Sequence, residues 1–302
     1  MKVLGKAFFV FFVGMLLTVF PKTKISFAEE KCLINDNWYN SKNRKSYTKG
    51  YMIENPKYIV IHHSAFKDLE SLKKVFEDNN VSCHYFIDGN GVLSNVIDDS
   101  CIAYHAGFSY WNGEENLNNS SICIELLNES PFIQDINDKQ YNALTILLKQ
   151  LKNKYNISNT NIVSHSDISY FNKDFMDGNF LNRKQDVSYL FRWKKLAQKN
   201  VGIWYHEEDI DKNDRTVLYY FGDEKDELID VKDKLREIGY KINDMSNKYS
   251  VEFYMQSIVF HRRFLPEQLI MAGQGLWTKS STDVLNAVVK EFYNLNSVLK
   301  QQ

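Results

Sequence analysis

The chain has 302 residues, with 37 basic and 38 acidic side chains and a formal net charge of −1. This balance argues against a nucleic-acid-binding protein, which would carry a basic stripe. The length exceeds the roughly 100–150 residues of a typical single domain, so two domains are predicted.

The first 28 residues have the composition of a secretory signal. Lys2 and Lys6 are followed by an apolar run of 14 residues over 7–20, and Ala28 ends a small-residue cleavage site. A transmembrane helix needs about 20 apolar residues, which favours a cleaved signal over an uncleaved anchor. Cleavage would leave 33 basic and 38 acidic side chains, a net charge of about −5. We expect an exported monomer, periplasmic or secreted, without a stable membrane span.

Four cysteines follow the predicted signal: Cys32, Cys83, Cys101 and Cys123. An oxidising compartment permits two disulfides, in any of three pairings. Cys83 and Cys123 both lie in apolar, strand-like stretches, where a small buried thiol is the alternative. The sequence does not choose between these possibilities.

The first half of the chain reads as alternating strands and helices. Residues 29–57 are polar and aromatic-rich, which is typical of a loop-rich arm. A buried strand is predicted at 58–62 and a helix at 68–78. Two strands at 84–88 and 92–97 flank an Asp-Gly-Asn-Gly turn, so they should form a hairpin.

A longer strand is predicted at 121–127, with Glu125 on the face opposite its alternating Ile and Leu side chains. Asn137 or Asp138 should cap a helix that ends near Tyr155. A strand at 162–165 and a short helix at 193–197 complete this part. Strands interleaved with helices predict an α/β fold with a mixed central β-sheet flanked by helices.

The composition changes beyond about residue 200. Residues 201–225 include a charged stretch without apolar periodicity, which suggests a linker. Three helical patterns follow, at 228–238, at about 250–264, and from Ser281 or Thr282 onward. We predict a small three-helix C-terminal domain over 226–302. It carries no cluster of catalytic residue types, so a binding module is expected.

Two predicted strands deliver a histidine at their ends, His62 and His165, and Asp186 closes an Arg-Lys-Gln-Asp motif. Two imidazoles and one carboxylate leave a fourth zinc position open, as in hydrolytic rather than structural zinc sites. Lys184 would lie beside the metal and stabilise a developing oxyanion. Glu125 is costly to bury without a partner, which favours a functional role. A lone histidine at a strand end is usually structural, so the prediction depends on the whole set.

Six ordered stretches over about residues 58–190 carry a family resemblance. They are Val60-Ile61-His62-His63-Ser64-Ala65, Ser82-Cys83-His84-Tyr85-Phe86-Ile87-Asp88, Ala103-Tyr104-His105-Ala106-Gly107, Asn118-Asn119-Ser120-Ser121-Ile122-Cys123-Ile124-Glu125-Leu126, Val163-Ser164-His165-Ser166-Asp167-Ile168 and Arg183-Lys184-Gln185-Asp186. Together they resemble the type-2 N-acetylmuramoyl-L-alanine amidases, which share a fold with peptidoglycan-recognition proteins. The stretch 231–240, more weakly, is similar to a small peptidoglycan-binding domain.

The resemblance implies a zinc amidase domain over 29–200 and a peptidoglycan-binding-like domain over 226–302. One Zn²⁺ would be bound by His62, His165 and Asp186. Glu125 would be the catalytic acid/base, and Lys184 would steady the tetrahedral intermediate.

The substrate-binding candidates are Tyr104 and His105, which the resemblance places along the cleft, together with His84 and Trp111. His84 packs under the site or touches substrate, and Trp111 forms a sugar-stacking wall or local core; the sequence leaves both choices open. The chain also departs from the family at two places. Val187-Ser188 replaces a usual Pro-Gly, and Cys123 replaces a usual Gly, which could narrow the cleft or add a thiol near the metal.

The function implied by the resemblance is hydrolysis of the amide between N-acetylmuramic or 1,6-anhydro-N-acetylmuramic acid and L-alanine. Peptidoglycan or muropeptides would be the partners. The main alternative is a non-catalytic peptidoglycan-recognition protein that uses the same cleft. The filled ligand positions, with Glu125 and Lys184, weigh against it. A phage endolysin and a generic exported binding protein fit less well.

Overall fold

The computed structural model describes residues 52–66, 68–170, 184–208, 210–271 and 275–299. The predicted signal, the arm up to residue 51, Cys32 and Arg183 lie outside these ranges. A five-stranded sheet has the order β3-β2-β6-β1-β7, in which β3 alone is antiparallel to its neighbour. The strands are β1 (Tyr58–Ser64), β2 (Tyr85–Ile87), β3 (Leu93–Asn95), β6 (Ser121–Leu127) and β7 (Ile162–Ser164). The predicted mixed α/β class is confirmed.

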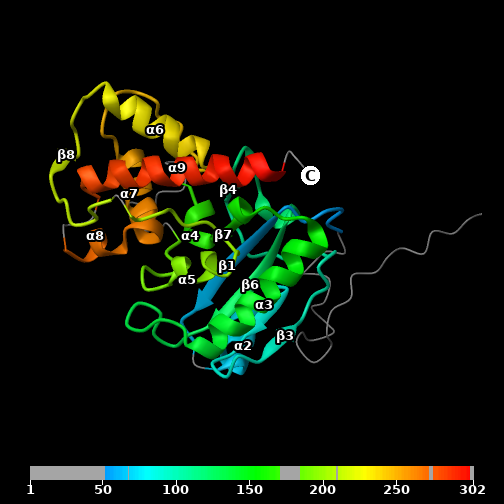
Figure 1. Cartoon of the computed structure of the whole chain (residues 1–302). Coiled ribbons are helices and arrows are strands. Elements are labelled where there is room, and N and C mark those ends of the chain that lie inside the picture. Colours follow the sequence, from blue (N-terminus) through cyan, green and yellow to red (C-terminus); the bar gives the residue numbers. More distant parts are fainter. Residues whose placement is uncertain (1–51, 67, 171–183, 209, 272–274, 300–302) are drawn as a thin grey trace, which may run out of the picture. The chain divides into compact units, whose positions relative to one another are not determined.

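One face of the sheet packs against the helix α3 (Asp138–Tyr155) (Figure 1). Alternation along the central strands directs every second apolar side chain to this face, so Ile61 and Ile124 share a core with Leu144 and Leu148 of the helix. The helix begins as predicted, because Asn137 and Gln140 form a capping box. Asn156, in the left-handed conformation, ends it.

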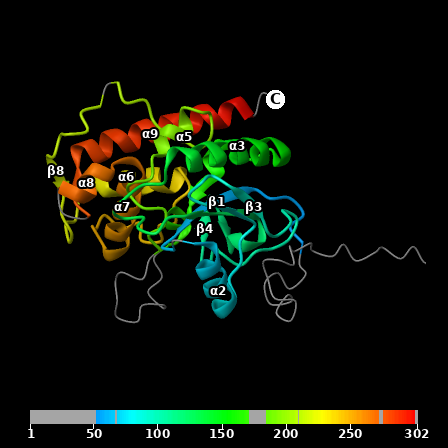
Figure 2. The ribbon, with the colours of Figure 1, turned by 90° about the horizontal axis from the view of Figure 1, so that it is seen from below.

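The helix α2 (Leu69–Asn79) lies on the opposite side of the sheet from α3 (Figure 2). The Asp68 carboxylate accepts the Ser71 backbone N–H at 2.9 Å and so caps the predicted helix. Leu72 contributes to a small core with Phe86 and Cys123. This side of the sheet also carries the polar side chains that form the candidate site.

Several short elements connect the strands. The helix α4 (His165–Ile168) follows β7 directly and is capped by Ser164 and Asp167. The helix α5 (Trp193–Ala197) lies where it was predicted. The others are β4 (Tyr110–Trp111), β5 (Glu114–Glu115), and the 3-10 helices η1 (Leu117–Asn119) and η2 (Asn159–Asn161).

The C-terminal part contains more elements than the three predicted helices. It has the helices α6 (Glu227–Glu237), α7 (Val251–Phe264), α8 (Pro266–Met271) and α9 (Lys279–Leu299). The strands β8 (Val217–Tyr219) and β9 (Trp277–Thr278) pair with each other. Pro266 suits the first position of α8, since that position needs no backbone donor. Strands of two or three residues are too short to give a periodic signal in the sequence.

The C-terminal helices share a hydrophobic core with the sheet. Val60 of β1 and Val163 of β7 belong to the same buried cluster as Leu235, Phe253 and Leu285. The described residues all belong to one compact unit, and the predicted boundaries at 200 and 226 stay predictions. Among the described helices, none is both long enough and apolar enough to cross a bilayer.

Gly239, the predicted end of α6, shows how closely the two parts approach. Its φ of +112° is open to glycine, and a Cβ there would lie 2.6 Å from the Trp111 ring. Its carbonyl accepts the Asn112 N–H at 2.9 Å. A larger residue at 239 would therefore push α6 away from the segment that contains β4.

Candidate metal centre

The neighbouring parallel strands β6, β1 and β7 bring three predicted site residues together towards the carboxyl ends of the strands. His62 is the register partner of Glu125, and His165 directly follows β7. Register partners on parallel strands point to the same face, so the imidazole and the carboxylate lie side by side. All three are almost fully buried, with 4–6% of their surface exposed.

Asp186 joins the two histidines through one oxygen. Its Oδ2 lies 3.0 Å from His62 Nδ1 and 3.1 Å from His165 Nδ1. The Asp186 carbonyl accepts the Ser166 N–H at 2.5 Å, which ties this segment to α4. The predicted ligand set is thus assembled from three segments distant in sequence.

The geometry of these three atoms fits a zinc ion. Ligand atoms about 2.0–2.1 Å from zinc at tetrahedral angles lie roughly 3.3 Å apart, close to the two distances observed here. All three donor atoms fall within 4.8 Å of one another, and the set is the N,N,O type that zinc accepts. This set of three donors among the described residues would leave a fourth position of a bound zinc ion for water or substrate.

Charge in this cluster is strongly coupled. Burial and the neighbouring His165 lower the pKa of His62 to about 4. Burial alone would raise the pKa of Asp186, but the imidazoles of His165 and His62 hold it well below its usual range. These shifts favour a neutral His62 beside the Asp186 carboxylate, which is the protonation state that metal binding requires of these two groups.

Glu125 has the environment of a proton-transfer group. Burial, and then the negative charge of Asp186, raise the pKa of its carboxyl well above the usual range. Lys184 lies on the exposed segment two residues before Asp186, and its charge contributes to lowering the pKa of His62. The structure therefore brings Lys184 into the electrostatic neighbourhood of the cluster.

Among the predicted substrate residues, Tyr104 and His105 are partly exposed, and His105 lies beside the cluster. His105 Nδ1 is 3.0 Å from His62 Nε2. The backbone N–H groups of His105 and Ala106 donate to Asn118 Oδ1 at 2.9 and 2.8 Å. Ser82 Oγ accepts the Tyr104 N–H at 2.7 Å. This segment is consequently held by four hydrogen bonds to three side chains.

His84 packs under the site, the first of its two predicted alternatives. It is fully buried, and both ring nitrogens bond to backbone. Nε2 donates to the Cys101 carbonyl at 2.8 Å, and Nδ1 accepts the Cys123 N–H at 3.0 Å. Because the side chain has no exposed surface here, it offers no direct contact to a substrate.

Trp111 likewise belongs to a core. It is 3% exposed, its Nε1 donates to the Thr160 carbonyl at 3.1 Å, and its ring meets that of Tyr240 edge-on. A sugar-stacking wall needs an exposed ring face, which Trp111 does not present. Its packing partners lie in the C-terminal part, more than 120 residues away in sequence, so the sequence pattern near Trp111 carried no sign of them.

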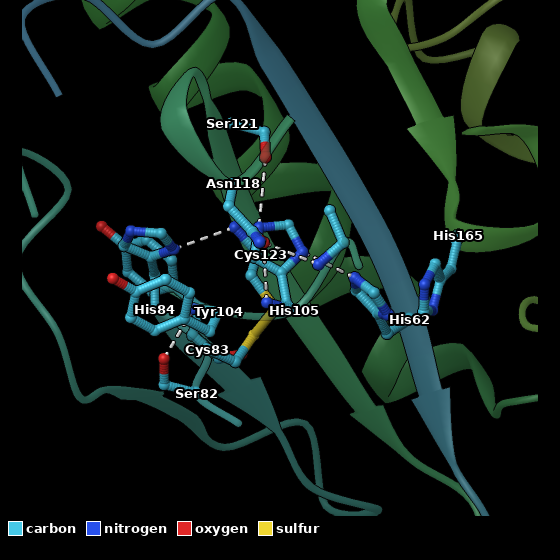
Figure 3. Close-up of a disulfide and its surroundings, with 12 residues drawn as sticks. His62, Ser82, Cys83, His84, Tyr104, His105, Asn118, Ser121, Cys123 and His165 are labelled. Atoms are coloured by element: carbon cyan, nitrogen blue, oxygen red, sulfur yellow. Dashed lines mark hydrogen bonds between the residues drawn. A yellow bond between two sulfur atoms is a disulfide. The ribbon is translucent and has the colours of Figure 1, made fainter. Parts of the chain in front are cut away.

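A disulfide between Cys83 and Cys123 forms part of the site's surroundings (Figure 3). The sequence left this pairing open, and the thiol considered at Cys123 is instead bonded to Cys83. Cys123 Sγ lies within 4.8 Å of a ring nitrogen of His62 and of His105, and both sulfurs lie within 4.8 Å of a Glu125 oxygen. The bridge thus joins the entry of β2 to the strand that carries Glu125.

The altered turn after Asp186 is supported by His63, which points to the sheet face opposite His62. His63 Nε2 accepts the Ser188 N–H at 2.8 Å, and Val187 is buried in the core under α3. These contacts hold the segment in place where the family usually has Pro-Gly. The structural role that the sequence favoured for His63 agrees with this arrangement.

Comparison with known proteins also indicates an amidase domain. Residues 53–186 match the family model described as N-acetylmuramoyl-L-alanine amidase. The zinc ligands and catalytic residues predicted from the sequence all lie within this matched segment, which is similar to that family. The chain is 30% identical to the N-acetylmuramoyl-L-alanine amidase AmiD of Escherichia coli over 191 residues, which are 59% of this chain and 64% of AmiD. It thus spans slightly less than two thirds of this relative.

Solved structures resemble a larger part of the chain. AmiD from E. coli, in complex with the substrate anhydro-N-acetylmuramic acid-L-Ala-D-gamma-Glu-L-Lys, has a TM-score of 0.61 and 25% identity. The match covers 78% of this chain and 89% of AmiD. AmpDh3 from Pseudomonas aeruginosa, in complex with anhydromuramic pentapeptide, has a TM-score of 0.62 at 22% identity and covers 86% and 98%. At 22% identity, the likeness to AmpDh3 shows a shared fold.

Proposed function

We propose that this protein is a zinc-dependent amidase that hydrolyses the bond between a muramic or anhydromuramic acid and L-alanine of peptidoglycan fragments. The supporting observation is the convergence of His62 Nδ1 and His165 Nδ1 on one oxygen of Asp186, beside the buried Glu125. The family match and the substrates bound to the similar structures support the same reaction.

His62, His165 and Asp186 would hold the zinc ion. When bound there, zinc would polarise the scissile carbonyl and lower the pKa of a water molecule. Glu125 would take a proton from the attacking water and return it to the departing L-alanine nitrogen. Burial raises the pKa of the Glu125 carboxyl, which favours the protonated form that the second step requires.

The other residues would orient and stabilise. Lys184, at the exposed side of the cluster, would meet the negative charge that develops on the carbonyl oxygen. Tyr104 and His105 would contact the substrate at the border of the site. We also propose export, on the basis of the composition of residues 1–28, and wall binding by the C-terminal helices, on the basis of the resemblance over 231–240.

Two substitutions test the site and the reaction separately. Asp186→Ala should abolish stoichiometric zinc and cleavage, measured by elemental analysis and by mass spectrometry of muropeptides. Glu125→Gln keeps the shape and should retain zinc while losing about 10²–10⁴-fold in kcat. A wild-type protein that binds muropeptides intact, with or without zinc, would instead support the non-catalytic recognition protein.

A further inference from the structure

His105 and Ser121 continue the hydrogen bonding of the proposed zinc ligand His62 into the protein interior (Figure 3). His62 Nε2 is 3.0 Å from His105 Nδ1, and His105 Nε2 is 3.1 Å from Ser121 Oγ. Ser121 Oγ in turn lies 2.5 Å from the Leu117 carbonyl. The contacts form an unbroken line from the site to the backbone of η1.

The direction of each bond follows from the chemistry of the two ends. A His62 Nδ1 that binds a metal carries no proton, so the proton of the neutral ring resides on Nε2. His62 Nε2–H must then donate to His105 Nδ1, and His105 must carry its own proton on Nε2 and donate it to Ser121 Oγ. The Ser121 hydroxyl is left to donate to the Leu117 carbonyl, which can only accept. Every polar atom in the line is satisfied in one arrangement.

The surroundings fix this line in place. Asn118 Oδ1 accepts two consecutive backbone N–H groups, those of His105 and Ala106, so the backbone that carries the second imidazole cannot rotate freely. Ser121 is fully buried at the start of β6, and its neighbour Ile122 pairs in register with Ile59. The His62 and His105 rings meet edge-on at 5.1 Å between centroids, as this bond requires.

We propose that His105, supported by Ser121, is a positioning residue that orients the zinc ligand His62 and fixes its tautomer. The inference rests on the zinc site of the proposed function and assigns His105 a role beyond contact with substrate. Partners that hold the second nitrogen of a ligating histidine typically contribute about 10–100-fold in metal affinity.

Ser121→Ala is the decisive variant, because a fully buried side chain cannot touch substrate. It removes the acceptor of the His105 Nε2–H and should raise the zinc dissociation constant several-fold, measured by competition with a chromogenic chelator. His105→Ala should raise it about 10–100-fold. Ser94→Ala, in the edge strand β3 of the same sheet, is the matched control and should leave zinc affinity unchanged.

A second readout separates positioning from substrate contact. Cobalt substituted for zinc has a visible absorption spectrum that reports ligand geometry, and it should change in Ser121→Ala and His105→Ala but not in Ser94→Ala. If His105 acts on substrate alone, KM will rise in His105→Ala while zinc affinity and the cobalt spectrum stay at wild-type values, and the inference is wrong. If the wild type cleaves muropeptides and the two variants keep its zinc affinity, the inference is wrong and the proposed function stands. If the wild type binds no zinc, both the inference and the proposed function are wrong.

Discussion

The two imidazoles of the candidate metal centre are supported in different ways. His62 lies in the middle of the sheet, and the contacts behind it come from neighbouring segments: His105, Ser121 and the Cys83–Cys123 disulfide. The Nε2 of His165 is buried and has no hydrogen-bond partner among the described residues. Instead, side chains from the C-terminal part of the chain hold the backbone segment that carries His165. One imidazole is thus held by contacts to its ring, and the other by contacts to the backbone segment that carries it.

Asp167, two residues after His165, is the centre of the second support. Its Oδ2 accepts Arg263 Nη1 of α7 at 2.7 Å, and its Oδ1 accepts the Tyr240 hydroxyl at 3.0 Å. Both charged side chains are almost completely buried. Arg263 also donates to the Ile162 carbonyl and lies over the Trp193 ring. The C-terminal helices therefore take part in building the site, in addition to any role in binding the wall.

The largest expected effect comes from breaking the ion pair between Arg263 and Asp167. Arg263→Met keeps the volume but leaves a buried carboxylate without its cation, which should cost about 3–5 kcal/mol in free energy of unfolding. Urea denaturation followed by circular dichroism measures it. Arg236→Met is the matched control, because its pair with Asp233 is half exposed and should contribute at most about 1 kcal/mol. Equal losses of free energy of unfolding in the two variants would contradict the conclusion that the Arg263–Asp167 pair supports the segment carrying His165.

The first support can be tested through the disulfide, which closes a loop with a sequence separation of 40. Replacing both cysteines with alanine should lower the free energy of unfolding by about 2–4 kcal/mol, since the unfolded chain regains the freedom that the bridge removes. Dithiothreitol should bring the wild type toward the stability of the double variant and change the double variant little. If reduction leaves the wild type unaltered, the bridge does not stabilise the His62 side.

The contacts around His62 and those around Asp167 differ in how well the sequence could predict them. The sequence could suggest that His62, His165 and Asp186 lie together, because the motifs occur in family order, and the structure brings these three side chains together. The α3 cap and the hairpin were predictable for a different reason, because both depend on residues close together in the chain. The second support was not, because Asp167 meets Arg263 across 96 residues and Tyr240 across 73. No local pattern distinguishes a buried arginine partner from a solvated one.

The pairing of the cysteines and the burial of Trp111 could not be predicted from the sequence, for a related reason. Cys83 meets Cys123 because β2 pairs with β6, and four cysteines alone permit three pairings. Trp111 is in a polar stretch, and its burial depends on Gly239 and Tyr240, which reach it from the other end of the chain. Zinc dependence, export and the roles of Glu125 and Lys184 stay predictions.

The smallest of the three effects concerns pH and the helix that carries Arg263. His261 is fully buried on α7, and burial, then the charge of Arg215, lower its pKa to about 3. Between pH 3 and 6.5 the unfolded chain therefore binds a proton that the folded chain refuses, so stability falls as the pH decreases through this window. From pH 7 to 5 the loss from this one group should be about 2 kcal/mol.

His261→Gln isolates this contribution, because glutamine can still bond Ser281, which His261 Nε2 contacts at 2.9 Å. Buried histidines on the His62 side, such as His84, also disfavour the proton, but they are present in both proteins and cancel in the difference. The free energy of unfolding of the variant should thus decline by about 2 kcal/mol less than that of the wild type between pH 7 and 5. Hydrogen exchange adds the location: α7 amides should lose more protection in the wild type than in the variant. If the free energy of unfolding depends on pH in the same way in both proteins, protonation of His261 does not destabilise the helix α7 that carries Arg263.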